Sequence, residues 1–155
     1  GLQPNFYPAK KLLADSNNFI MAIRIKPQVR KNPQTKEIKY YVGLDRQVPM
    51  RKEMFLDGVE KRSTLSSADC KGALDAIEYE IKQALLNGNT VRLGDLGSFS
   101  ITLTSEGVET KSAVTANNIK RVRVKFYPSV SLMRDMQPVS KRGMAMFVDV
   151  TKQQD

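Results

Sequence analysis

The sequence predicts an α+β fold in which helices come first and an antiparallel β-sheet follows. Between residues 66 and 87 the apolar residues stand three or four apart, which is the period of an amphipathic helix. From Val91 onward apolar and polar residues alternate, which is the period of a strand with one covered face. The helical stripe consists of Cys70, Leu74, Ile77, Ile81 and Leu85.

The long helix carries a sequence signal at each end. Ser66 and Asp69 stand three residues apart, the spacing at which two side chains can cap a helix N-terminus reciprocally. Gly88 predicts the end of the helix, because glycine readily adopts the left-handed conformation found there. A shorter helix is predicted over residues 50–61, and it is too short to cover the whole apolar stripe. The stripe therefore predicts a core shared between two chains.

The composition favours a polyanionic partner and excludes several kinds of site. The 155 residues include 25 Lys and Arg against 16 Asp and Glu, a net charge of +9. There is no His and there is one Cys, so disulfides, thiolate zinc sites and Cys/His nucleophile pairs are excluded within one chain. No carboxylates stand at spacings that indicate catalysis or a metal site. We expect no enzyme activity, no cofactor, no small-molecule substrate and no membrane association.

The positive charge lies in the β-rich parts of the sequence. Residues 51–87 carry six basic and seven acidic residues, so the helical part is nearly neutral. Residues 110–142 carry eight basic residues and one acid, and residues 21–47 carry seven basic and two acidic residues. The helices are therefore predicted to be scaffold, and the strands to carry the charged surface.

The run NGNTVRLGDLGSF at residues 87–99, following a capped helix, resembles the bacterial histone-like HU/integration host factor family of DNA-binding proteins. The similarity covers residues 47–137, and further features resemble the HU-related branch of Bacteroidetes type. The resemblance implies a helical hairpin, an antiparallel sheet with an extended arm, and a short C-terminal helix. It also implies a homodimer that binds duplex DNA through a pair of β-arms in the cytoplasmic nucleoid.

The chain is predicted to have four segments. Residues 1–20 form an extension, and residues 21–46 form an added N-terminal β-hairpin. Residues 47–137 form the HU-like DNA-binding domain, and residues 138–155 form a C-terminal strand and tail. The strand is the apolar run at residues 144–150, which is expected to pair at a sheet edge, with the N-terminal hairpin as a candidate partner.

Residues 120–127 are the clearest candidate for a binding surface. Three cations alternate there with three apolar residues, so one face of a strand is expected to pack on the core while the other presents charge. Cations two residues apart on a strand are spaced much like the phosphates of one DNA strand. The competing interpretation is a solvated basic face with no ligand. The candidate DNA-binding residues are Arg121, Arg123 and Lys125 as a floor, Lys120 and Lys111 on the arm, and Arg92, Arg30 and Lys31 as flanking contacts.

Two segments differ from what the resemblance implies. Residues 104–118, at the arm position, are small and polar, and the usual Arg-rich tip with a Gly-Arg-Asn-Pro run is missing. Strong DNA kinking by this arm is therefore not predicted. Residues 30–35 read RKNPQT, which is similar to the arm tip of HU proteins but lies far from the arm position. They form either a basic β-turn or a relocated contact in which Arg30 and Lys31 bind phosphates.

The predicted function is binding of duplex DNA with low sequence specificity, as a nucleoid-associated dimer that bends or compacts DNA. The alternative is a dimeric structural or protein-interaction module that has kept the scaffold and lost the function of its arms. Binding of RNA or single strands is a variant of the first hypothesis. Duplex is favoured because the polar strand face has few aromatic residues on which unpaired bases could stack.

Overall fold

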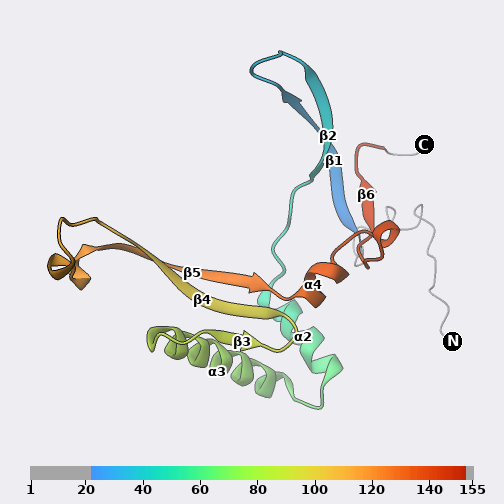
Figure 1. The fold of residues 1–155 in the computed structure, drawn as a ribbon. Coiled ribbons are helices and arrows are strands. Elements are labelled where there is room, and N and C mark those ends of the chain that lie inside the picture. Colours follow the sequence, from blue (N-terminus) through green and yellow to red (C-terminus); the bar gives the residue numbers. More distant parts are fainter. Residues whose placement is uncertain (1–21, 153–155) are drawn as a thin grey trace. The chain divides into compact units, whose positions relative to one another are not determined.

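The computed structural model describes residues 22–152, so the predicted extension over residues 1–20 lies outside the described part. The chain divides into two compact units, Met50–Arg134 and a second built from Gly1–Pro49 and Asp135–Asp155, of which residues 22–49 and 135–152 are described. Helices and mainly antiparallel sheets are both present, and the predicted α+β class is confirmed (Figure 1). The predicted segment boundaries stay predictions.

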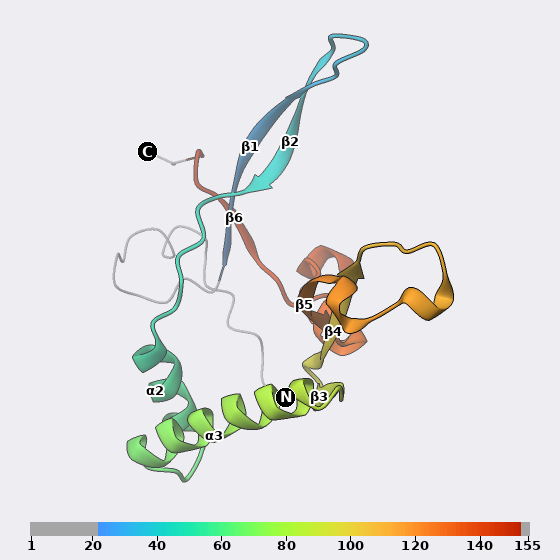
Figure 2. The same ribbon diagram turned by 90° about the vertical axis from the view of Figure 1, so that its left-hand side faces the viewer.

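The first unit begins with a helical hairpin made of α2 (Lys52–Arg62) and α3 (Ser67–Leu86), shown in Figure 2. The predicted capping box is present at the start of α3. The Asp69 backbone N–H donates to Ser66 Oγ at 3.2 Å, and the Ser66 backbone N–H donates to the Asp69 carboxylate at 3.3 Å. Just after the C-terminus of α3, Gly88 has φ 79°, the left-handed conformation that the sequence predicted.

Three antiparallel strands follow in the order β3-β4-β5, with bounds Val91–Leu93, Gly97–Ser105 and Ile119–Pro128. The turn between β3 and β4 needs glycine at Gly97, which has φ 152° and whose backbone lies against the Tyr127 carbonyl. A Cβ at that position would lie 2.2 Å from the carbonyl oxygen. Helix α3 contacts β3 and β4, and the β4–β5 hairpin extends past the end of α3 (Figure 1).

The distal end of the β4–β5 hairpin is closed by two short 3₁₀ turns, η1 (Lys111–Ala113) and η2 (Ala116–Asn118). After β5 comes the predicted short helix α4 (Val130–Asp135). Ser129 Oγ accepts the Leu132 backbone N–H at 3.0 Å, which caps this helix. The Ser129 hydroxyl also donates to the Asp95 carbonyl, and this hydrogen bond joins the start of α4 to the β3–β4 turn.

The second unit is a small sheet with strand order β2-β1-β6. Strands β1 (Ile23–Lys31) and β2 (Ile38–Leu44) form an antiparallel hairpin, and β6 (Phe147–Asp149) pairs with β1 in parallel. The apolar run at residues 144–150 was expected to form a strand, but the strand β6 covers only three residues of that run. Ala145 does not pair with β1, because its backbone bonds to Gln137 and Val139 near the short 3₁₀ turn η3 (Val139–Lys141).

The apolar core within one chain is small. Among the described residues, Cys70 is the one buried hydrophobic side chain, with 2% of its surface exposed, as the sequence predicted for this residue. The expectation that the apolar face of β5 packs on a core is wrong for a single chain. Val122 is 52% exposed and Val124 is 60% exposed in one chain. Apolar side chains that the alternation predicted to be covered are therefore exposed to solvent in a single chain.

Candidate nucleic-acid interface

The β4–β5 register places a hydroxyl beside each predicted cation of β5. Arg121 pairs with Thr104, Arg123 with Thr102, and Lys125 with Ser100. Side chains directly opposite each other in an antiparallel pair project from the same face of the sheet. These residues therefore form one polar face, which we call the sheet face. The sheet face comprises Arg92, Ser98, Ser100, Thr102, Thr104, Arg121, Arg123, Lys125 and Tyr127.

The opposite side of the same two strands is apolar. Leu103 pairs with Val122, Ile101 with Val124, and Phe99 with Phe126. The last pair is in ring contact. The strict alternation predicted from the sequence is thus present, and it separates charge from apolar surface along the hairpin.

Strand β3 extends the sheet face by one row. Arg92 pairs with Ser98, and Ser98 pairs with Tyr127 on its other side, so these three residues lie across the sheet. The structure therefore brings Arg92 onto the same face as the β5 cations. Sequence reasoning treated Arg92 as a flanking residue and gave Tyr127 little weight. The signal for Arg92 was the turn at residues 94–97, which fixes the register of β3 on β4. The signal for Tyr127 was the alternation of β5, because Tyr127 stands two residues after Lys125 and so projects from the same face.

The cations of the sheet face are exposed and form no ion pair with any described residue. Two of the three basic residues of α2 differ in this respect. Lys52 lies 3.7 Å from Asp75, and Lys61 lies 2.8 Å from Asp57. The sheet face thus has charge available for a ligand, whereas part of the helical charge is already balanced.

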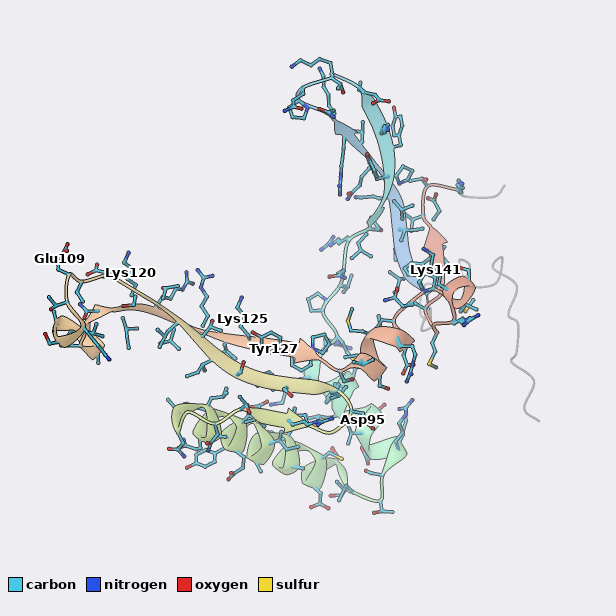
Figure 3. The ribbon with its side chains drawn as sticks, viewed as in Figure 1. Asp95, Glu109, Lys120, Lys125, Tyr127 and Lys141 are labelled. Atoms are coloured by element: carbon cyan, nitrogen blue, oxygen red, sulfur yellow. The ribbon has the colours of Figure 1, made fainter. Side chains whose placement is uncertain are left out.

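A β-bulge changes the position of Lys120. Thr104 pairs with Arg121, but Ser105 pairs with Ile119, so Lys120 has no partner on β4. A bulge bends its strand and strengthens the local twist. Figure 3 shows Lys120, Lys125 and Tyr127 along β5, and Glu109 near the tip of the hairpin. Lys120 is therefore placed where the hairpin turns into its tip.

The tip of the hairpin is folded but carries little positive charge. The Glu106 backbone N–H donates to the Asn118 carbonyl at 2.8 Å, and the Thr115 N–H donates to the Asn118 side chain at 2.8 Å. Lys111 is the first residue of η1 and is exposed. Glu106 and Glu109 outnumber it, which agrees with the absence of an Arg-rich tip in the sequence.

Arg30 and Lys31 lie in the second unit, at the distal end of β1. Sequence reasoning missed Lys39, which pairs directly with Arg30 across β1 and β2. It also missed the contact of Arg30 with Tyr41, whose ring centroid lies 5.0 Å from the guanidinium carbon. Both follow from the register of a hairpin that closes at residues 32–37.

The cations near the start of β1 are balanced by one carboxylate. Asp45 lies 3.2 Å from the Arg24 guanidinium and 3.5 Å from the Lys26 ammonium. A hydrogen bond from the Arg46 backbone lowers the pKa of the Asp45 carboxyl most, and the hydrogen bond and charge of Arg24 and the charge of Lys26 lower it further. Arg24 and Lys26 are therefore less available to a ligand than the residues further along the hairpin.

Residues 22–152 contain no group of three or more His, Cys, Asp and Glu that could hold a metal ion. None of the helices in this part of the chain is long and apolar enough to cross a membrane.

Two solved structures of bacterial proteins are similar to parts of this chain. The chain is 26% identical to a valine-to-isoleucine mutant of HU from Thermotoga maritima, with a TM-score of 0.44, over 57% of this chain and 100% of that one. It is 19% identical to a candidate bacterial DNA-binding protein from Bacteroides vulgatus, with a TM-score of 0.47, over 72% of this chain and 44% of that one. It thus spans less than half of the Bacteroides protein. No curated protein matches it.

The match to a family model is more extensive than these structural similarities. The family is described as an HU domain fused to a winged helix-turn-helix, immunoglobulin or glycine-rich motif, and its model matches residues 21–141. The matched range includes the helical hairpin, the sheet face and the β1–β2 hairpin. The chain belongs to this HU-related family.

Proposed function

We propose that this protein binds duplex DNA with low sequence specificity through the sheet face, as a nucleoid-associated homodimer that bends or compacts DNA. The observation that carries the proposal is the row of unpaired cations on β5, each beside a hydroxyl of β4. Cations neutralise phosphates and release counterions, while hydroxyls bond phosphate oxygens. Neither kind of contact reads base sequence, so low specificity follows from the chemistry of the face.

We propose a homodimer because apolar side chains are exposed in a single chain. The apolar side of the β4–β5 hairpin includes Leu103, which is 55% exposed, together with Val122 and Val124. On α3, Ile77 belongs to the predicted stripe and is 48% exposed. Exposed apolar surface of this extent favours association, and a second copy is the occupant that the resemblance to HU proteins implies. The two apolar faces together would form the core that a single chain lacks.

A protein-interaction module remains the competing function, and the composition of the hairpin tip favours it. Residues 104–118 contain Glu106 and Glu109 but one basic residue, Lys111, and carboxylates near a duplex oppose binding. The sheet face argues for DNA, because the cores of protein interfaces are depleted of charged residues. Nucleic-acid interfaces are much more positively charged.

A mobility-shift titration with a duplex of about 30 base pairs tests the proposal. The test variant is Arg121→Ala/Arg123→Ala, and the control is Lys52→Ala/Lys61→Ala, which removes two paired cations from α2. If each arginine contacts one phosphate, the slope of log affinity against log salt becomes shallower by about 0.9 per contact in the test variant. Sedimentation shows whether each variant keeps its oligomeric state. Equal slopes in both variants, or no binding by wild type at low salt, would overturn the proposal.

A further inference from the structure

The distal half of the β1–β2 hairpin carries positive charge that the described part of the chain does not balance. The register places Arg30 directly opposite Lys39 on one face of the hairpin. Lys31 pairs with Ile38 and projects from the other face, and Lys36 lies in the turn. Glu37 is the one acidic residue in this region, and its carboxylate lies 3.8 Å from the Lys39 ammonium with both side chains mostly exposed. An exposed ion pair of this kind contributes little. We call Arg30, Lys31, Lys36 and Lys39 the tip cluster.

The pairing of Arg30 with Lys39 has a cost within the free protein. Directly opposed residues in an antiparallel pair have their Cβ atoms about 5 Å apart, and like charges at such positions destabilise a sheet. At the start of the same strands, Asp45 balances Arg24 and Lys26. The charge arrangement thus changes along the hairpin, from two cations that share one carboxylate at the start of β1 to four cations near one weakly paired carboxylate at the tip. An external anion bound at the tip would remove the repulsion.

The turn that presents these cations is held by its own hydrogen bonds. The Asn32 side-chain oxygen accepts the backbone N–H groups of Gln34 and Thr35, at 2.9 and 3.3 Å. The Lys36 N–H donates to the Asn32 carbonyl at 2.9 Å, and Lys36 has φ 61°, in the left-handed region that is disfavoured for a residue with a side chain. A turn fixed in this way loses less freedom when a ligand binds.

Arg30 is also oriented before any ligand is present. Its guanidinium carbon lies 5.0 Å from the centroid of the Tyr41 ring, which is a cation–π contact. A guanidinium binds phosphate oxygens with two parallel N–H donors. The same face includes Gln28, whose side chain lies across Gly43, where a Cβ would come within 2.0 Å. This face therefore carries hydrogen-bond donors and cations.

We infer that the tip cluster is a second phosphate-binding surface for duplex DNA, separate from the sheet face. The face around Arg30 and Lys39 is rich in cations and poor in apolar side chains, which fits a nucleic-acid backbone better than a protein surface. The identity of the ligand rests on the proposed DNA-binding function, whereas the presence of an anion site does not. One chain then carries two phosphate-binding surfaces, on two separately compact units.

The test compares Arg30→Gln/Lys39→Gln with the sheet variant Arg121→Ala/Arg123→Ala and with Lys52→Gln/Lys61→Gln, which removes the same charge from α2. Binding to a duplex of about 30 base pairs is measured at several salt concentrations. We expect the tip variant to lose about 0.9 from the salt slope for each phosphate contact, and the α2 variant to lose none. Without DNA, the tip variant should melt no lower than wild type, because its opposed charges are gone.

The possible results separate this inference from the proposed function. A tip variant with the slope of the α2 variant, while the sheet variant has a reduced slope, overturns the inference and leaves the proposed function standing. A reduced slope in the tip variant, together with an unchanged slope in the sheet variant, supports the tip cluster as a DNA-binding surface and overturns the assignment of DNA binding to the sheet face. Binding to poly-glutamate, an acidic polypeptide, is measured for the same variants. If the tip variant loses binding to poly-glutamate while its salt slope for duplex DNA equals that of wild type, the assignment of the tip cluster to nucleic acid is overturned. Wild type that binds no duplex at low salt overturns both.

Discussion

Phe99 and Phe126 face each other across β4 and β5, with ring centroids 5.1 Å apart and ring planes inclined by 50°. The pair lies on the apolar side of the strands whose other side carries the proposed DNA-binding cations. Tilted rings at this distance are a favourable aromatic arrangement. The two rings therefore hold together the strands on which the register of the sheet face depends.

Phe126→Ala should destabilise the protein by about 2 kcal/mol, which is below the range for a fully buried ring because Phe126 is 44% exposed in one chain. Urea unfolding followed by circular dichroism measures this change. Phe126→Leu keeps an apolar side chain and should cost less. Equal and negligible effects of both substitutions would show that the ring pair does not support the sheet.

Val124→Lys should disrupt the proposed dimer, because it places a charge on the apolar side of β5. An unpaired charge in a covered interface costs several kcal/mol, so the dimer dissociation constant should rise by about 100-fold or more. Sedimentation equilibrium measures this constant. Thr102→Lys adds the same charge to the sheet face and should leave the dimer intact. If both variants remain dimers, the apolar side of the hairpin is not the subunit interface.

Glu106→Gln/Glu109→Gln should strengthen DNA binding at low salt, because it removes two negative charges from the hairpin tip (Figure 3). At about 8 Å from a phosphate in water each charge is worth roughly 0.5 kcal/mol, so an increase of about fivefold is expected. Titration at two salt concentrations should show that the gain shrinks as salt rises. Unchanged affinity at both concentrations would mean that the tip stays away from the duplex.

The second unit should lose stability in acid. Hydrogen bonds and nearby cations hold the pKa of Asp45 below its ordinary value of 3.8, and hydrogen bonds from the Thr151 hydroxyl and backbone similarly lower the pKa of Asp149. A lowered carboxyl pKa contributes stability that is fully present above the unfolded value and is lost as pH falls through the folded value. The loss should therefore occur below about pH 4.

Amide NMR signals of β1 and β2, followed from pH 6 to pH 2, measure this loss. Asp45→Asn/Asp149→Asn should weaken these strands already at neutral pH and should show a smaller further change in acid. An identical acid transition in wild type and variant would assign the pH dependence to other carboxylates.

Local pattern was sufficient to predict the elements near the sheet face. Ser66 and Asp69 marked the start of α3, and the alternation around Arg123 identified its two faces. Sequence reasoning named the N-terminal hairpin as a candidate partner for the C-terminal strand, and β6 does pair with β1. The parallel direction and the register of Ile23 on Phe147 were beyond this reasoning, because local periodicity carries no register information. The 3₁₀ turns at the hairpin tip were missed because small polar residues have no periodicity to indicate them.

The apolar side of β5 shows a different limit of sequence reasoning. Its alternation predicts correctly that Val122 and Val124 project from one face, but it does not say whether the same chain covers that face. How far α3 covers the hairpin is a tertiary feature that the local pattern does not contain, and the hairpin continues past the helix (Figure 1). The sequence thus predicted which residues lie on the binding face. It did not predict whether the same chain or a second chain covers the apolar side of β5.

The parallel pairing of β1 with β6 has a consequence for the order of folding. All of Met50–Arg134 is synthesised between these two strands, so the second unit cannot complete its sheet until the first has emerged from the ribosome. Closing such a long loop is slow unless the intervening chain is already compact. Until β6 arrives, β1 and β2 are a two-stranded ribbon, which is at best marginally stable in water. During translation, folding of the helical unit therefore precedes completion of the β1–β2–β6 sheet.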